Sequence, residues 1–187
     1  PWNFPFWQVF RFVIPTIIAG NSVIVKHASN VTGCLLQISS IFNESSLPKN
    51  IFNALVIPSY ETDIVINNPI VKAISLTGSE HAGMSVASLA GKVIKRNVLE
   101  LGGSDPFIVF KSANLHKAAE CAVKSRMLNA GQSCIAAKRF IIEESIQSDF
   151  INLIRASITE MKLGNPIELN TQIGPLAKRD IMDELHD

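Results

Sequence analysis

Short apolar runs alternate with amphipathic stretches along the chain. Six runs rich in Val, Ile and Phe predict strands, at residues 22–26, 52–57, 71–77, 97–101, 107–110 and 139–144. Several of these runs are apolar on both faces, which is typical of strands covered by helices on each side. The alternation predicts βα units around a mostly parallel sheet, and therefore an α/β fold.

Four stretches between these runs have the spacing of helices, at residues 30–46, 79–91, 114–128 and 147–162. The last is the clearest, because Phe150, Ile154 and Ile158 recur at three-to-four spacing before a Gly and a Pro end the pattern. The final residues contain the start of another helix. Two glycines and a proline in "ELGGSDP" (100–106) indicate a boundary, which predicts domains at 1–101 and 102–187.

Composition and charge limit the kinds of partner that we expect this chain to bind. Of 187 residues, 47% are hydrophobic and 18% charged, which is typical of a globular chain. The net charge of +1 is spread along the sequence, so neither a nucleic acid nor a membrane surface is an expected partner. The apolar region 9–25 is interrupted by Arg11 and Pro15. Its apolar runs are therefore much shorter than the roughly 20 consecutive apolar residues that a membrane span needs.

Three cysteines, Cys34, Cys121 and Cys134, show neither CxxC spacing nor a nearby histidine cluster. The sequence therefore predicts no metal site and no disulfide framework. A reducing, cytoplasmic location fits best.

Two residues are candidates for chemistry. Cys134 in "NAGQSC" (129–134) lies at a predicted turn from helix to strand, where a substrate could reach the thiol. The alternative is a buried structural cysteine, which is common. Glu100 ends a predicted strand, where βα sheets place functional groups, and a partly desolvated carboxylate there could take a proton from water. The alternative is a surface glutamate.

Four further residues are weaker candidates. Gly78 and Ser79 in "LTGSEHAG" (76–83) lie between a strand and a helix, where backbone N–H groups suit a phosphate, although many tight turns look the same. Asn3 in "PWNFP" could donate to an oxyanion. Lys26 could reach a ribose or phosphate, or lie in solvent at a strand end.

Together these stretches resemble the aldehyde dehydrogenase family. The matching motifs occur in the family's order: "PWNFP" (1–5), "AGNSVIVKHAS" (19–29), "LTGSEHAG" (76–83), "LELGGSDPFIV" (99–109), "NAGQSC" (129–134) and "IGPL" (173–176). The 34-residue step from Glu100 to Cys134 is also the family's usual one. The resemblance implies part of a Rossmann-like cofactor-binding domain followed by the first part of the α/β catalytic domain.

The resemblance implies covalent catalysis with NAD or NADP. Cys134 would attack the aldehyde, and the Asn3 amide and the Cys134 N–H would hold the oxyanion. Loss of a hydride to the nicotinamide would leave a thioester, and Glu100 would activate the water that hydrolyses it.

The resemblance also implies cofactor contacts. Trp2 would lie near the nicotinamide end, Lys26 at the adenosine ribose, Gly78 and Ser79 at the pyrophosphate, with Gly83 a packing glycine in the helix that follows.

The cofactor region departs from the family at two places. Ser29 stands where many NAD-preferring members have a glutamate that would repel a 2′-phosphate, so we expect NADP to be accepted. The turn "IPSYETD" (57–63) lacks the glycines that many relatives carry, which leaves the packing of the adenine open.

The substrate expected from the resemblance is a dicarboxylic semialdehyde. The sequence is most similar to bacterial succinate-semialdehyde dehydrogenases, in which an arginine at the position of Arg11 can hold the distal carboxylate. The alternative for Arg11 is an arginine on a helix surface. Leu128 stands where some members have a second arginine, and Arg126 lies two residues earlier.

Full-length members are longer at both ends. By the resemblance, this chain would be a central part that lacks the oligomerisation strand of the homo-oligomeric enzymes, with apolar sheet faces left uncovered. Two hypotheses follow: a segment of an active dehydrogenase, or a truncated and catalytically inactive remnant of one.

Overall fold

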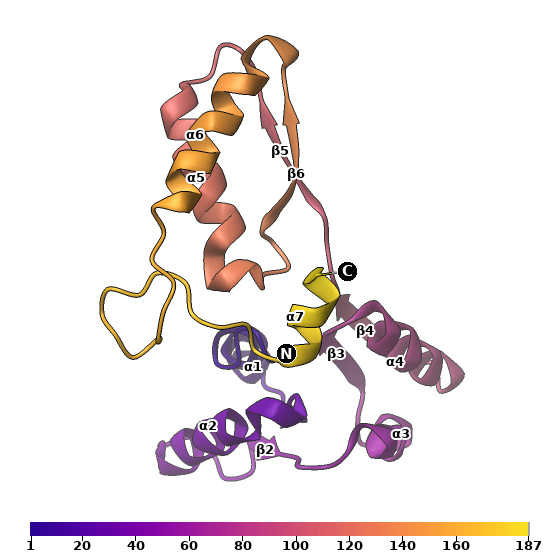
Figure 1. Cartoon of the computed structure of the whole chain (residues 1–187). Helices are drawn as coiled ribbons and strands as arrows, with labels where there is room; N and C mark the ends of the chain where they lie inside the picture. The colour runs from indigo at the N-terminus through magenta and orange to yellow at the C-terminus, as the bar shows by residue number, and fades with distance from the viewer. Residues whose placement is uncertain (187) are drawn as a thin grey trace. The chain divides into compact units, whose positions relative to one another are not determined.

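The structure, a computed structural model, describes residues 1–186. It consists of two compact units, Pro1–Gly102 and Gly103–Asp187. Within the described residues, the six strands form three parallel pairs with helices connecting them, which confirms the predicted α/β class (Figure 1).

The first unit contains two parallel strand pairs. Its elements are α1 (Trp7–Ile18), β1 (Val23–Val25), α2 (Thr32–Glu44), β2 (Phe52–Ala54), α3 (Thr62–Asn67), β3 (Ala73–Thr77), α4 (Glu80–Lys92) and β4 (Arg96–Glu100), with short 3₁₀ turns η1 (Ser29–Val31) and η2 (Ser59–Glu61). β1 pairs with β2, and β3 pairs with β4. Thr77 lies beside Glu100, so β3 and β4 end together.

The core of this unit joins α1 and α2 to the β1–β2 pair. Its buried members are Val9, Val13, Val23, Leu35, Ile38, Phe42 and Phe52. The rings of Phe42 and Phe52 stack with centroids 4.6 Å apart. The core thus fixes α1, the helix that carries Arg11, against the strands.

The second unit is built around one parallel pair. It contains β5 (Asp105–Val109), α5 (Leu115–Met127), η3 (Leu128–Gly131), β6 (Ala137–Ile142), η4 (Glu144–Ile146), α6 (Gln147–Thr159) and α7 (Arg179–His186). Figure 1 shows α5 and α6 side by side, with Val109, Ala119, Ala122 and Phe150 buried between the helices and the strands.

A bulge interrupts the β5–β6 ladder. Asp105 lies opposite Ala137 and Pro106 lies opposite Arg139, so Lys138 is an extra residue on β6. A bulge of this kind turns the side chains on either side of it in new directions.

All six predicted strands and all four predicted helices occur, with shifted ends. Residues 55–57 lie after β2, and residues 71 and 72 lie before β3. Two helices are missing from the prediction. Pro15 lies inside α1, where proline removes a helical hydrogen bond, and α3 has only six residues.

The expectation of strands covered on both sides is wrong for this chain. Val98 is 60% exposed, Ile108 55% and Ile141 50%. The exposed apolar side chains agree instead with the expectation of uncovered sheet faces. Among residues 1–186, no helix is long and apolar enough to cross a membrane.

Candidate functional site

Cys134 lies in the connection between α5 and β6, as the sequence predicts. It is a free, partly buried thiol. Before it, Asn129, Ala130 and Gly131 all have left-handed backbone conformations, with φ of 55°, 55° and 79°. Only the glycine adopts this conformation without strain, so the surrounding contacts must hold the turn.

Side chains hold this turn at both of its ends. The Arg126 guanidinium donates to the Gly131 carbonyl at 3.2 Å, so this arginine has a structural contact inside the turn. The Gln132 amide donates to the Asn129 carbonyl at 3.0 Å, and its Oε1 accepts from the Ala177 N–H at 2.9 Å. These bonds offset part of the backbone strain.

The backbone of Cys134 itself has two close neighbours. Lys138, the extra residue of the bulge, donates from Nζ to the Cys134 carbonyl at 2.8 Å. A Cβ placed on Gly103 would lie 3.3 Å from the same oxygen. The lysine therefore holds the Cys134 carbonyl, and any larger residue at position 103 would make a tight contact with the same oxygen.

Glu100 lies at the carboxyl end of β4, where the sequence predicts it. Its carboxylate forms an ion pair with Arg11 of α1, with Nη2 and Oε1 3.3 Å apart. The side chains are 45% exposed for Arg11 and 51% exposed for Glu100. About half of the Glu100 side chain is therefore out of contact with water, and its carboxylate has a cationic partner.

Asn3 and the segment around it are held by nearby backbone contacts. The Asn3 Oδ1 accepts from the Phe4 N–H at 3.1 Å. The carbonyl of Pro5 accepts from Nε2 of His27 at 2.8 Å, and Nδ1 of His27 accepts from the Ala28 N–H at 2.9 Å.

His27 is a buried residue that the sequence reasoning missed. Both ring nitrogens have partners when the ring is neutral, with the proton on Nε2, because a carbonyl can only accept. Burial lowers the pKa of His27, and the charge of Lys26 lowers it further, against the opposing effect of the Pro5 carbonyl. The one available signal was a histidine close behind the apolar run "VIV" (23–25), with only Lys26 between them.

The predicted adenosine-side residues lie around one cavity of the first unit. Its volume is about 270 Å³. Lining residues are His27, Ser29, Thr32, Leu35, Leu55, Val56, Ile57 and Pro58. Nearby, Lys26 donates from Nζ to the Ser59 hydroxyl at 3.3 Å. Apolar walls that also include Ser29 and Thr32 suit a purine and its ribose, and Lys26 is adjacent in sequence to the lining residue His27.

The predicted pyrophosphate residues lie at the start of α4. The Ser79 hydroxyl caps this helix by accepting from the Ala82 N–H at 3.3 Å, and Gly78 precedes it. A Cβ on Gly83 would lie 2.7 Å from a methyl carbon of Leu101, so α4 packs closely on the residue after β4. An exposed helix start with its N–H groups outward can bind a phosphate group.

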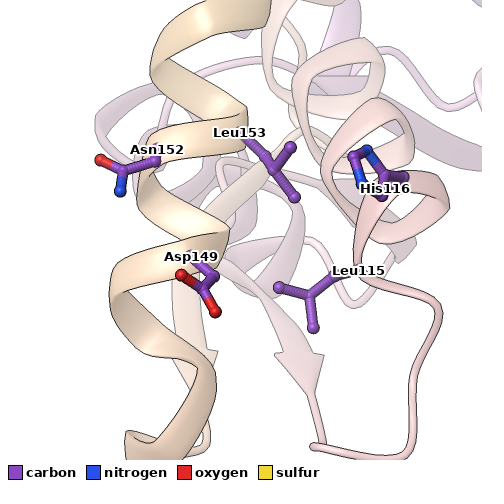
Figure 2. Close-up of a pocket in the computed structure, with 5 residues that line it drawn as sticks. All are labelled: Leu115, His116, Asp149, Asn152 and Leu153. Carbon is purple, nitrogen blue, oxygen red and sulfur yellow. The ribbon is translucent and has the colours of Figure 1, made fainter.

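The structure thus brings Arg11 to Glu100, places Ser29 and Lys26 beside one cavity, and sets Gly78 and Ser79 at a helix start. Cys134 belongs to the other unit. A second hollow, in the second unit, lies between α5 and α6 and contains none of the predicted residues (Figure 2). Leu115, His116, Asp149, Asn152 and Leu153 line it. Residues 1–186 contain no group of three or more His, Cys, Asp or Glu that could hold a metal ion.

Comparison with known proteins gives similar sequences and similar folds. A probable NADP(+)-dependent succinate-semialdehyde dehydrogenase of Synechocystis is 48% identical over 185 residues, which cover 99% of this chain and 41% of that protein. A succinic semialdehyde dehydrogenase of Streptococcus pyogenes, solved in complex with NADP+, matches with a TM-score of 0.95 at 33% identity. That match covers 100% of this chain and 42% of the other.

A third similar structure contains NAD+ and an aldehyde. An aldehyde dehydrogenase of Pseudomonas syringae, solved with NAD+ and octanal, matches with a TM-score of 0.92 at 30% identity, over 96% of this chain and 37% of that one. The chain spans about 40% of the length of the curated relatives it matches. The sequence profile of the aldehyde dehydrogenase family matches residues 1–187, and the chain therefore belongs to that family.

Proposed function

We propose that the chain takes part in the NAD(P)-dependent oxidation of an aldehyde to a carboxylic acid, with succinate semialdehyde as the substrate. The family match over residues 1–187 carries this proposal. The names of the most similar curated relatives, which include NADP(+)-dependent succinate-semialdehyde dehydrogenases, support the choice of substrate and cofactor.

Cys134 has the role of nucleophile. Its thiolate sulfur bonds to the aldehyde carbon, and the carbonyl oxygen becomes an oxyanion. The Asn3 amide and the backbone N–H of Cys134 stabilise that charge. In support, the turn before Cys134 is strained and fixed by Arg126 and Gln132, as a positioned backbone donor requires.

Glu100 has the role of general base. Its carboxylate takes a proton from water while the water oxygen bonds to the thioester carbon. The carbon–sulfur bond breaks, Cys134 leaves as a thiolate, and the acid is released. The position of Glu100 at the end of β4, with half of its side chain exposed, supports this role because water can reach it.

The proposal includes the cofactor contacts that the resemblance implies. Lys26 and Ser29 hold the adenosine ribose or its 2′-phosphate, and Gly78 and Ser79 lie at the pyrophosphate. Trp2 lies near the nicotinamide end, and Gly83 lets α4 pack closely. A bound NAD(P)+ supplies the acceptor for the hydride that the aldehyde carbon loses. Ser29 in place of a carboxylate favours acceptance of NADP.

Three assignments accompany this function as proposals. Residues 1–101 belong to the cofactor-binding domain and residues 102–187 to the thiol domain. Arg11 binds the distal carboxylate of the substrate, since its guanidinium is 45% exposed and can form two parallel hydrogen bonds. The setting is the cytoplasm, and the whole enzyme is a homo-oligomer.

A spectrophotometric assay tests the reaction. The chain is mixed with succinate semialdehyde and NADP+ or NAD+, and the absorbance of the reduced cofactor is followed. We expect a rise that Cys134→Ala abolishes. Cys121→Ala is the matched control, because Cys121 is an exposed thiol on α5 with no proposed role, and it should leave the rate unchanged.

Two outcomes would count against the proposal. Activity that persists in Cys134→Ala removes the thiol from its role. No rise at all, under conditions where a full-length relative turns over, favours the alternative of a catalytically inactive remnant.

A further inference from the structure

The ion pair between Arg11 and Glu100 joins two residues to which we assign different tasks. Arg11 lies on α1 and Glu100 ends β4, so the pair forms only in the folded first unit. Arg11 is also the one charged residue in Trp7–Ile18. A substrate carboxylate that approaches this helix therefore meets one guanidinium, whose charge is already paired with Glu100 through Nη2.

We propose that the distal carboxylate of the substrate and Glu100 compete for Arg11, so that binding of a dicarboxylic semialdehyde releases the general base. This inference rests on the proposed function and adds to the same site a regulation of Glu100 by the substrate. Arg11 is a positioning residue for Glu100 as well as a ligand for the substrate.

The exposure of the pair makes such an exchange feasible. Both side chains are about half exposed, so a small anion and water can reach them. Exposed ion pairs are weak, since water screens the charges and ordering two long side chains costs entropy. A second carboxylate can therefore displace the first without a large loss, and the guanidinium has five N–H donors to offer it.

The exchange affects the hydrolysis step. A carboxylate that accepts hydrogen bonds from a guanidinium is a poorer proton acceptor, because the lone pairs that would take the proton are engaged. When the acyl group carries its own carboxylate, that group stays on Arg11 and Glu100 is available to water. An acyl group without a carboxylate leaves Glu100 paired, so its thioester is hydrolysed more slowly.

A binding experiment tests the competition without any turnover. Succinate, the product of the proposed reaction, is titrated at low ionic strength into the ¹⁵N-labelled chain, and the Nε–H signal of Arg11 is followed by NMR. Glu100→Gln, which keeps the shape but removes the charge, should bind succinate about two- to fivefold more tightly than the unmodified chain. Glu100→Ala should do the same, in case the glutamine variant does not fold.

Two controls accompany the titration. Arg11→Gln in the Glu100→Gln background should lose succinate binding. Arg96→Gln in that background should keep it, because Arg96 lies at the other end of β4 from Glu100. Succinate that binds no more tightly to folded Glu100 variants than to the unmodified chain, or fails to bind them, overturns the inference.

A kinetic experiment separates the two proposals. In Arg11→Gln, kcat/KM for succinate semialdehyde should fall, whereas kcat for butanal should rise up to about fivefold because Glu100 is no longer held. In Arg11→Lys, both quantities should lie between those of the unmodified chain and those of Arg11→Gln, because lysine keeps the charge but lacks the planar guanidinium. An equal fall of kcat for both aldehydes overturns the inference. If no aldehyde is turned over, the proposed function fails, and the succinate titration still decides the competition.

Discussion

His27 links the segment that carries Asn3 to the end of β1. The ring is 6% exposed, and as a neutral side chain it bonds the Pro5 carbonyl and the Ala28 N–H together. A second proton would have to go on Nδ1, where it would face the Ala28 N–H. The position of Asn3, the proposed oxyanion donor, therefore depends on a histidine that stays neutral.

The stability of the first unit should therefore fall in acid. Because burial lowers the pKa of His27, the unfolded chain binds more protons than the folded chain below the ordinary histidine pKa of about 6.5. The contribution is complete above that value and is lost as the pH falls through the folded pKa. Thermal melts at pH 7.5, 6.5 and 5.5 should show the melting temperature falling.

A glutamine variant isolates this effect. His27→Gln should lower the free energy of unfolding at pH 7.5 by about 1–3 kcal/mol, because buried partners lose a bond, and should flatten its pH dependence between 7.5 and 5.5. His81→Gln is the matched control, since His81 is exposed on α4. An unchanged pH slope in His27→Gln would mean that other groups cause the acid sensitivity.

At the scale of single residues, the sequence predicts in which element or turn a residue lies better than it predicts which side chains that residue contacts. Cys134 and Glu100 are at the predicted turn and strand end, because glycines and apolar runs mark those boundaries locally. The Arg11–Glu100 pair and the burial of His27 could not be predicted. Both depend on where segments far apart in the sequence meet, and no local pattern carries that information.

Among the elements, α4 ends in a motif that its sequence fits poorly. The Ile94 N–H bonds the Gly91 carbonyl at 3.1 Å, and the Lys95 N–H bonds the Ala90 carbonyl at 2.9 Å. This is a Schellman motif, which usually has glycine at the left-handed position. Here that position holds Ile94, a β-branched residue with φ of 54° and a 93% exposed side chain.

Replacing this isoleucine should stabilise the protein. Ile94→Gly removes the strain of a β-branched residue at positive φ and loses almost no buried surface, so the free energy of unfolding should rise by about 1 kcal/mol. Urea denaturation measures the change. Met84→Gly is the matched control within the same helix, at a 66% exposed interior position, and should lower the stability by a similar amount. A loss of stability in Ile94→Gly would contradict the assignment of the motif.

Strands are the elements that the sequence predicts most completely. Each lies in or beside an apolar run bounded by turn or polar residues, a signal that needs no tertiary context. Helix α1 was missed because Pro15 lies inside it and few polar residues mark its exposed face. The apolar runs alone suggest that β4, β5 and β6 are covered, although an apolar run does not say what covers it; only the resemblance to longer family members predicts uncovered faces.

The whole molecule has two units with separate cores. Ile38 is fully buried in the first core and Phe150 is 1% exposed in the second. Ile38→Ala should cost about 2–5 kcal/mol and Phe150→Ala about 3–5 kcal/mol, through lost contacts and the cavities that remain. We expect each loss to stay within its own unit.

Hydrogen exchange followed by mass spectrometry checks this expectation. Ile38→Ala should speed exchange in peptides from residues 1–102, and Phe150→Ala should speed it in peptides from residues 103–186. Faster exchange throughout the chain in both variants would show that the two units unfold together.

Pro106 lies at the bulge between β5 and β6, where its pairing partner Arg139 directly follows Lys138, a contact of the thiol-bearing turn. A proline brings no N–H to the ladder, and it is at Pro106 that β6 takes in Lys138 as an extra residue. That extra residue is the one whose ammonium group holds the Cys134 carbonyl. The irregularity opposite a proline on β5 thus supplies the ammonium group that anchors the backbone of Cys134, the proposed nucleophile.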